Sequence, residues 1–364
     1  MKKNPDTMFA SDQIEKLRPM SEPLLAWYET HARALPWRID HAPYRVWVSE
    51  IMLQQTRVEA VIPYFERFLH ALPNLPALAR APEDQLLKLW EGLGYYSRVR
   101  NMQKAAQSVV QGGGTELPES YEQLLALPGI GPYTAGAIAS IAFGIPVPAV
   151  DGNVLRVLAR LLACGDDIAL SPVKCAFEQA DAGLLPQNRP GDYNQAMMEL
   201  GATVCLPNAA PRCAICPVRV FCAAEKQGSP QMYPYKSPKK PRVIEERTVF
   251  VVVAEKKVLL RRRTDKGLLA SMWELPNLSG WLETGEISAV LAGWGIEDAA
   301  PSALGDGKHI FTHIEWRMKG VLVLPCACTP VEGSIWANAA EIAERYALPS
   351  VFRPYARLLP ELLS

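Results

Sequence analysis

Residues 127–135 read LPGIGPYTA, and residues 151–153 read DGN one helix later in the chain. The first stretch predicts a helix, a turn with two glycines, and a second helix that has Pro132 at its first position, where a missing N–H costs nothing. In such a helix-hairpin-helix, Gly129 and Gly131 let backbone N–H groups gather at a helix N-terminus and bind a phosphate without charged side chains. An ordinary glycine-capped helix turn is the alternative. The full string with its downstream aspartate favours the DNA-binding interpretation.

Length and charge limit the classes of protein to which the chain belongs. A chain of 364 residues is longer than one typical domain, so two domains are expected. The 38 basic and 38 acidic residues balance, which argues against binding nucleic acid through bulk charge. The sequence has no apolar run that could span a bilayer, and residues 1–5 are polar, unlike a signal peptide. We therefore expect a cytoplasmic protein without membrane association.

The pattern of apolar residues divides the chain into two parts and a linker. Residues 1–229 carry helical periodicity, and residues 230–246 have the basic, proline-rich composition of a linker. Residues 247–364 contain β runs at 248–254, 258–260 and 320–324. The sequence thus predicts a mostly α-helical region followed by an α+β domain.

Four cysteines cluster at the end of the helical region. Cys205, Cys213, Cys216 and Cys222 give the spacing C-x7-C-x2-C-x5-C. Disulfides are not expected in a cytoplasmic chain, so this spacing predicts a metal or cluster site. Four-cysteine zinc sites usually pair two C-x2-C knuckles, whereas here one close pair is flanked by longer gaps. On spacing alone, zinc and an iron–sulfur cluster both remain open.

Three further strings give the chain a family resemblance, namely LPWR at 35–38, VSEIMLQQT at 48–56 and EGLGYYSR at 91–98. With the hairpin and the cysteines, they make nearly the whole sequence resemble the MutY-type adenine DNA glycosylases. The resemblance implies a helix-hairpin-helix catalytic region with an iron–sulfur loop at 205–222, followed by a MutT-like (Nudix-like) domain. It implies a [4Fe–4S] cluster on the four cysteines. The first cysteine gap is one residue longer than the family's usual six, which leaves the path of the loop open.

The same resemblance implies an activity and a partner. The expected reaction is base excision repair, in which adenine is removed where it is mispaired with 8-oxoguanine or G in double-stranded DNA, leaving an abasic site. We expect a monomeric bacterial protein that acts at the nucleoid.

Two carboxyl groups suit this chemistry. Breaking the N-glycosidic bond of adenine needs a proton for the base and a negative charge beside the oxocarbenium ion that develops on the sugar. Glu50 has the apolar helical neighbours Val46, Trp47 and Leu53, which raise the pKa of a carboxyl group and suit it as the acid. Asp151 precedes a helix as its N-cap, where amide N–H groups favour the ionised form. The alternative is that Glu50 lies on a helix surface and Asp151 is only a cap.

Tyr133 decides the subclass of enzyme. In the related endonuclease III-like glycosylases this position is Lys, whose amine attacks the sugar and cleaves the strand through a Schiff base. A phenol forms no imine, so the sequence predicts a monofunctional glycosylase. Tyr133 and Asn153 are then expected to form hydrogen bonds around Asp151 and the sugar. A buried structural tyrosine is the alternative.

The adenine must leave the duplex before it reacts, so other side chains must fill the gap and hold the base. Gln55, Leu93 and Tyr95 resemble the family's wedge and stacking residues, and Thr56 closes the same motif as Gln55. Routine packing of helices and turns is the alternative for these positions.

The adenine pocket is implied by the same resemblance. It points to Trp37, Arg38 and Gln195, and some relatives carry Glu at the last of these positions. Either side chain can form hydrogen bonds with a base edge. For Trp37, a place in the core is the alternative.

The second domain resembles the MutT-like fold at residues 266–276 but lacks the acidic R-E-x-x-E-E-x-G helix of Nudix hydrolases. This absence argues against a metal-dependent pyrophosphatase. Phe311, Thr312 and His313 resemble the family's F-S-H loop that reads 8-oxoguanine, with a threonine hydroxyl in place of serine. An alternating hairpin over 309–313 is the alternative.

Two rival functions remain at this stage. One is an endonuclease III-like glycosylase with lyase activity, which Tyr133 argues against. The other is a non-catalytic protein that carries a cluster and recognises damaged DNA. For that protein, changing Glu50 or Asp151 to an amide would leave its activity intact.

Overall fold

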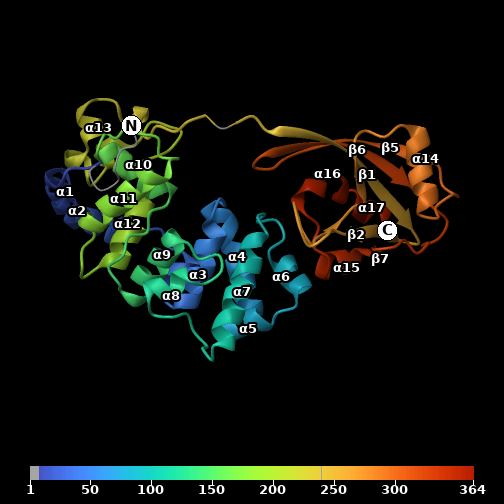
Figure 1. Ribbon diagram of the computed structural model, residues 1–364, viewed down its shortest axis with the longest axis horizontal. Coiled ribbons are helices and arrows are strands. Elements are labelled where there is room, and N and C mark those ends of the chain that lie inside the picture. The colour runs from blue at the N-terminus through green and yellow to red at the C-terminus, as the bar shows by residue number, and fades with distance from the viewer. Residues whose placement is uncertain (1–7, 239) are drawn as a thin grey trace. The chain divides into compact units, whose positions relative to one another are not determined.

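A computed structural model describes residues 8–238 and 240–364 (Figure 1). The polar N-terminal residues 1–5 and Lys239 of the predicted linker lie outside the described residues. The described chain forms two compact units, one made of the residues up to Arg80 together with Asn101–Pro238, and one made of Ala81–Arg100 together with the residues after 239. The segment 81–100 thus groups with the C-terminal part of the chain. The boundaries expected at 229 and 247 remain predictions.

Helices build the first unit, as the periodicity predicts. They are α1 (Ser11–Leu17), η2 (Arg18–Met20), α2 (Ser21–His31), η3 (Pro36–Arg38), α3 (Pro43–Leu53), α4 (Val58–Ala71), α5 (Leu75–Arg80), α7 (Ser97–Gln111, which starts in the second unit), α8 (Tyr121–Leu125), α9 (Pro132–Phe143), α10 (Gly152–Leu161), α11 (Ser171–Leu184), α12 (Pro190–Thr203), η4 (Cys213–Ile215), η5 (Arg219–Phe221), α13 (Ala223–Lys226) and η6 (Pro230–Met232).

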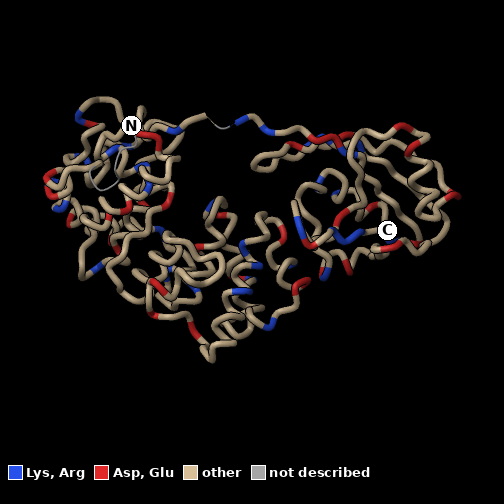
Figure 2. Tube along the Cα trace, viewed as in Figure 1, with Lys and Arg blue, Asp and Glu red and all other residues tan. Residues whose placement is uncertain are grey.

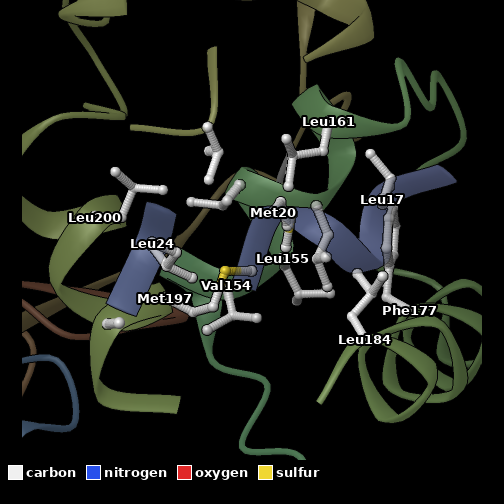
Figure 3. Packing of buried hydrophobic residues seen from close by; sticks show 14 of the residues in the cluster. Leu17, Met20, Leu24, Val154, Leu155, Leu161, Phe177, Leu184, Met197 and Leu200 are labelled. Carbon is white, nitrogen blue, oxygen red and sulfur yellow. The ribbon is translucent and has the colours of Figure 1, made fainter. Parts of the chain in front are cut away.

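One core of this unit forms where α10 packs against α2 and α12. Val154 and Leu158 of α10 are fully buried, in keeping with their helical spacing. Figure 3 shows Val154 beside Leu24 of α2 and Met197 of α12. This packing fixes the start of α10, and with it the residue that caps the helix.

The hairpin has the local geometry that its sequence predicts. Gly129 has φ +77°, a conformation that other residues rarely adopt, and Gly131 is the N-cap of α9 with Pro132 at the first position of the helix. A Cβ atom at Gly136 would overlap the carbonyl oxygen of Pro148, so α9 approaches the backbone of 145–150 closely. That segment leads directly to Asp151.

The second unit contains a mixed sheet. Its elements are α6 (Glu83–Leu89), β1 (Val243–Ala254), β2 (Lys257–Arg262), β3 (Trp273–Glu274), β4 (Asn277–Ser279), α14 (Thr284–Gly293), β5 (Ser302–Ile310), β6 (Ile314–Val323), β7 (Ser334–Ala337), α15 (Ala339–Glu344), η7 (Ser350–Phe352), α16 (Arg353–Ala356) and α17 (Leu359–Leu362). The strand order is β3-β2-β1-β6-β5, with β1 parallel to β6 and antiparallel to β2, while β4 pairs with β1 and β7 with β2.

Both faces of the central strand β1 are buried. Along β1, Val249 and Val251 belong to the core on one face, and Phe250 and Val252 belong to the core on the other. A fully buried strand of this kind reads as a continuous apolar run. The strand begins at Val243, four residues before the start expected for the domain, so the end of the predicted linker is already β structure.

Charges are spread over the chain. Figure 2 shows Lys and Arg interspersed with Asp and Glu along both units, in keeping with the balanced totals. Among the described residues, no helix has the length and apolar character needed to cross a membrane.

Candidate functional site

A cavity of about 840 Å³ in the first unit brings together most of the residues singled out in the helical region. Its lining comes from η3, α3, α9, α12, the start of α10 and the turn after α3. The predicted residues in this lining are Trp37, Arg38, Glu50, Gln55, Thr56, Tyr133, Asp151, Asn153 and Gln195. Gly129 and Gly131 are not part of this lining.

Glu50 is a buried carboxyl group in this cavity. It lies on α3 with 6% of its surface exposed. Burial raises the pKa of Glu50 to about 7, and the negative charge of Asp151 acts in the same direction. The Tyr133 hydroxyl, which donates a hydrogen bond to Glu50 Oε2, and the Arg38 cation oppose the rise. At neutral pH a substantial fraction of Glu50 therefore carries a proton.

Asp151 caps α10 as expected. Its Oδ1 accepts hydrogen bonds from the backbone N–H groups of Asn153 and Val154 at 2.8 Å each, and its Oδ2 accepts one from Asn153 Nδ2 at 2.8 Å. Burial nevertheless raises the pKa of Asp151, against the effect of these donors and of Arg156. The prediction of an ionised Asp151 took account of its N-cap position but not of its burial. The three donors still favour the anion at Asp151 over the anion at Glu50.

Tyr133 has a different partner from the expected one. Its hydroxyl donates to Glu50 rather than to Asp151, and it also contacts Met198 Sδ at 3.4 Å. The reason is its position on the first turn of α9, which faces α3. Asn153 does bind Asp151, and its Oδ1 accepts from Arg156 Nη2 at 2.8 Å.

Three further predicted residues of the lining differ in burial. Trp37 is 6% exposed and packs edge-on against Phe65 at 5.4 Å between ring centroids, so it belongs to the core and also lines the cavity. Gln195 on α12 is 7% exposed. Gln55 is exposed and has φ +59°, which turns the chain sharply after α3.

Several residues of the cavity were not found from the sequence. They are Arg33, Lys174, Met198, Glu199 and Lys236. Glu199 could have been predicted from the sequence, because it lies four residues after Gln195 on one helix and therefore on the same face. No sequence pattern predicts that Lys236 lines the cavity, since its position depends on the path of the segment after α13. That segment is tied to the helices by a hydrogen bond from the backbone N–H of Ile168 to the carbonyl of Tyr235.

The four clustered cysteines line a second, small cavity of about 30 Å³. All four are free thiols. Buried Arg160 of α10 lies against them, and its Nη1 donates to Cys205 Sγ at 3.1 Å. In the described parts of the chain, no group of three or more His, Cys, Asp or Glu side chains is arranged to hold a single metal ion. Arg160 was also missed from the sequence.

The remaining predicted residues lie in the second unit. Tyr95 is 47% exposed, and its hydroxyl lies 3.0 Å from the Thr312 hydroxyl. Phe311 packs edge-on against Trp316 at 5.3 Å, and the carbonyl of His313 accepts a hydrogen bond from Val243. Residues 311–313 form the turn between β5 and β6. Leu93 is 7% exposed, and this burial favours the alternative that it packs within the fold in this structure.

Family models match both parts of the chain. Residues 48–179 match the HhH-GPD superfamily of base excision DNA repair proteins, and residues 248–358 match the NUDIX domain. A solved thermostable thymine-DNA glycosylase is 25% identical with a TM-score of 0.51, and the match covers 58% of this chain and 98% of that one.

Curated relatives extend the match to most of the sequence. The adenine DNA glycosylase of Homo sapiens is 36% identical, covering 91% of this chain and 73% of the relative. The enzyme of Rattus norvegicus is 35% identical over 91% and 77%, and that of Buchnera aphidicola is 33% identical over 74% and 78%. With a helical unit of the matching fold and paired carboxyl groups in its main cavity, the chain belongs to the adenine DNA glycosylase family.

Proposed function

We propose that this adenine DNA glycosylase removes adenine paired with 8-oxoguanine, with Glu50 as the general acid and Asp151 as the anion that stabilises the sugar cation. One observation carries the proposal. The two carboxyl groups line one cavity in different surroundings, since Asp151 accepts three hydrogen bonds and Glu50, which is buried on α3, accepts one from Tyr133. Environments that separate two carboxyl groups in this way assign an acid and a stabiliser.

The chemistry follows from these positions. Glu50 donates its proton to a ring nitrogen of adenine, and the bond between that base and C1′ of the deoxyribose breaks with its electron pair going to the base. The Asp151 carboxylate lowers the energy of the oxocarbenium ion. Water then adds to C1′ and loses a proton to the Glu50 carboxylate. The products are adenine and an abasic site.

Tyr133 supports a monofunctional enzyme. Its hydroxyl is engaged with Glu50, and a phenol makes no Schiff base with the sugar. Borohydride reduction during turnover is therefore expected to trap no covalent protein–DNA adduct. Efficient trapping would instead favour the glycosylase with lyase activity.

Single-turnover cleavage of a duplex with one A:8-oxoguanine pair tests the proposal. The wild-type protein is expected to release adenine, whereas Glu50→Gln and Asp151→Asn bind the same duplex and lose about 10³-fold or more in rate, because each variant removes a group that acts in the transition state. Base release that survives both substitutions would leave a non-catalytic damage-binding protein as the better account.

The base pocket and the wedge complete the proposal. Arg38 and Gln195 bind the edge of the extruded adenine beside Trp37, while Gln55, Thr56, Gly129, Gly131 and Leu93 act on the duplex. What supports this assignment is that Arg38, Gln195 and Trp37 line the same cavity as Glu50. The protein is proposed to act as a monomer, which its mass in solution tests.

The turn at 311–313 is proposed to read 8-oxoguanine together with Tyr95. The support is the pair of hydroxyl groups at 3.0 Å, in which one hydroxyl donates to the other and the second keeps its O–H free beside the exposed Tyr95 ring. Thr312→Ala is expected to reduce the preference for A:8-oxoguanine over A:G, and Thr312→Ser, which keeps the hydroxyl, to retain it. Equal preferences in the two variants would contradict the assignment.

Cys205, Cys213, Cys216 and Cys222 are proposed to hold a [4Fe–4S] cluster. Soft thiolates suit such a cluster, and Arg160 supplies a buried cation beside the sulfurs, which balances their negative charge. When bound, the cluster cross-links the loop and leaves the excision chemistry to the main cavity. Anaerobically purified protein is expected to absorb visible light, whereas zinc, with a filled d shell, gives none.

A further inference from the structure

Glu199 is a buried carboxylate in the wall of the main cavity that the mechanism above does not use. Its side chain is 1% exposed. Its Oε1 accepts hydrogen bonds from Arg33 Nε at 2.6 Å and the Arg33 backbone N–H at 3.2 Å. Its Oε2 accepts from Arg33 Nη2 and Arg38 Nη2, each at 2.9 Å. Burial alone would raise the pKa of Glu199, but these two arginines outweigh it, so the pKa is lowered and the group is ionised.

Glu199 places Arg38 in the cavity wall. Arg38 also donates from Nη1 to the carbonyl of Arg33 at 3.1 Å, and its guanidinium lies over the Tyr28 ring at 5.4 Å. A planar guanidinium that is held from two sides keeps its remaining N–H groups in fixed directions. Because Glu199 lies one helical turn after Gln195, α12 carries both a predicted base contact and the residue that holds the other base contact.

Glu199 also pairs with one of the charges that act on Glu50, the Arg38 guanidinium. The groups that act on Glu50 are Tyr133 of α9, Asp151 at the start of α10 and Arg38 of η3. The Arg38 cation favours the Glu50 carboxylate and so opposes the acid form. With Glu199 ionised, the cluster of Arg33, Arg38 and Glu199 carries one net positive charge rather than two.

We propose that Glu199 is a positioning residue for base excision, which holds Arg38 in the cavity wall and offsets its charge so that Glu50 keeps its proton. The inference rests on the proposed function, because it takes Glu50 as the acid. It adds a residue that touches neither the base nor the sugar and acts through Arg38.

The test is the pH dependence of single-turnover adenine release from an A:8-oxoguanine duplex, measured from about pH 5 to about pH 9 in three variants. In Glu199→Gln, the midpoint of the alkaline limb is expected to move down by about half a unit to one unit, which lowers the rate at pH 8, taken as a fraction of the acid plateau, by about threefold to tenfold relative to the wild type at the same pH. Glu199→Asp keeps the charge and is expected to keep the wild-type midpoint, although its shorter side chain perturbs the same packing. Arg33→Gln removes a positive charge and leaves Glu199 to Arg38 alone, so its midpoint is expected to move up.

Opposite shifts in Glu199→Gln and Arg33→Gln would support the inference, because a loss of packing lowers the amplitude and the rate at every pH without moving the midpoint. If Glu199→Gln does not fold, the midpoints of Glu199→Asp and Arg33→Gln are compared instead. An upward shift in Arg33→Gln, with the wild-type midpoint in Glu199→Asp, would then support the inference. Midpoints equal to the wild type in all folded variants would overturn it. Failure of the proposed function looks different, since the wild-type protein itself would then release no adenine.

Discussion

At the scale of single residues, the proposed mechanism depends on the protonation of Glu50. Because burial raises its pKa to about 7, the acid form decreases above neutral pH. The single-turnover rate of adenine release is expected to fall about tenfold per pH unit above this pKa. A rate that stays level up to about pH 9 would contradict the role of Glu50 as the acid.

The hydrogen bond from Tyr133 lowers the pKa of Glu50. Its hydroxyl donates to the Glu50 carboxylate, which favours the charged form. Tyr133→Phe removes this donor with little change in volume, so the pKa of Glu50 is expected to rise and the alkaline limb of the rate to move to higher pH. Measuring the midpoint in both proteins checks the sign, and a downward shift would contradict it.

Asp181 on α11 is a buried acid away from the cavity. Its Oδ1 accepts from Tyr193 at 3.1 Å, and burial raises its pKa to about 7 from 3.8. The folded protein thus binds this proton more tightly than the unfolded chain, so the stability linked to Asp181 is complete below about pH 4 and is lost as the pH rises through 7. The free energy of unfolding is expected to fall by about 2 to 4 kcal/mol over this range. Chemical denaturation of Asp181→Asn is expected to lack this part of the pH dependence.

At the scale of elements, the site depends on how closely α9 approaches residues 145–150. Because a Cβ at Gly136 would overlap the carbonyl of Pro148, Gly136→Ala is expected to cost about 1 to 3 kcal/mol of unfolding free energy, or more. Adenine release should slow as well, because Asp151 follows the displaced segment. Gly165→Ala is the matched control, since nothing lies within 4 Å of its added Cβ. Equal thermal stability of the two variants would contradict the close approach.

The site combines a local motif, the N-cap of α10, with the packing of several helices. The cap of α10 needs only the four consecutive residues 151–154, whereas the cavity needs α3, α9, α10 and α12 to converge. Val154 and Leu158 bury one face of α10 in the core. This packing places Asp151, at the start of α10, in the same cavity as Glu50 of α3.

At the scale of the whole molecule, the balanced charge bears on DNA affinity. With a formal net charge of zero and charges interspersed along both units, attachment must depend on a few local phosphate contacts. For inert Glu50→Gln on an undamaged duplex, a plot of log K against log salt concentration is expected to have a slope between about −2 and −5, the value for roughly two to five phosphates. Fluorescence anisotropy measures it, and a slope steeper than about −7 would contradict the expectation.

The sequence by itself determined whatever depends on neighbours along the chain. The turn at Gly129, the start of α9 at Pro132 and the cap at Asp151 are local, because they need only particular φ angles and backbone donors. The helical and α+β character of the two parts also follows from short-range periodicity. The matching strings were enough to identify the family.

Only the tertiary structure decided which groups meet. The partner of Tyr133 is Glu50, 83 residues away, and Glu199 binds Arg33 and Arg38 across more than 160 residues. Burial raises the pKa of Asp151 against its own cap, an effect that no local pattern reveals. Desolvation and long-range charge depend on everything that surrounds a side chain, and those surroundings exist only once the helices have packed.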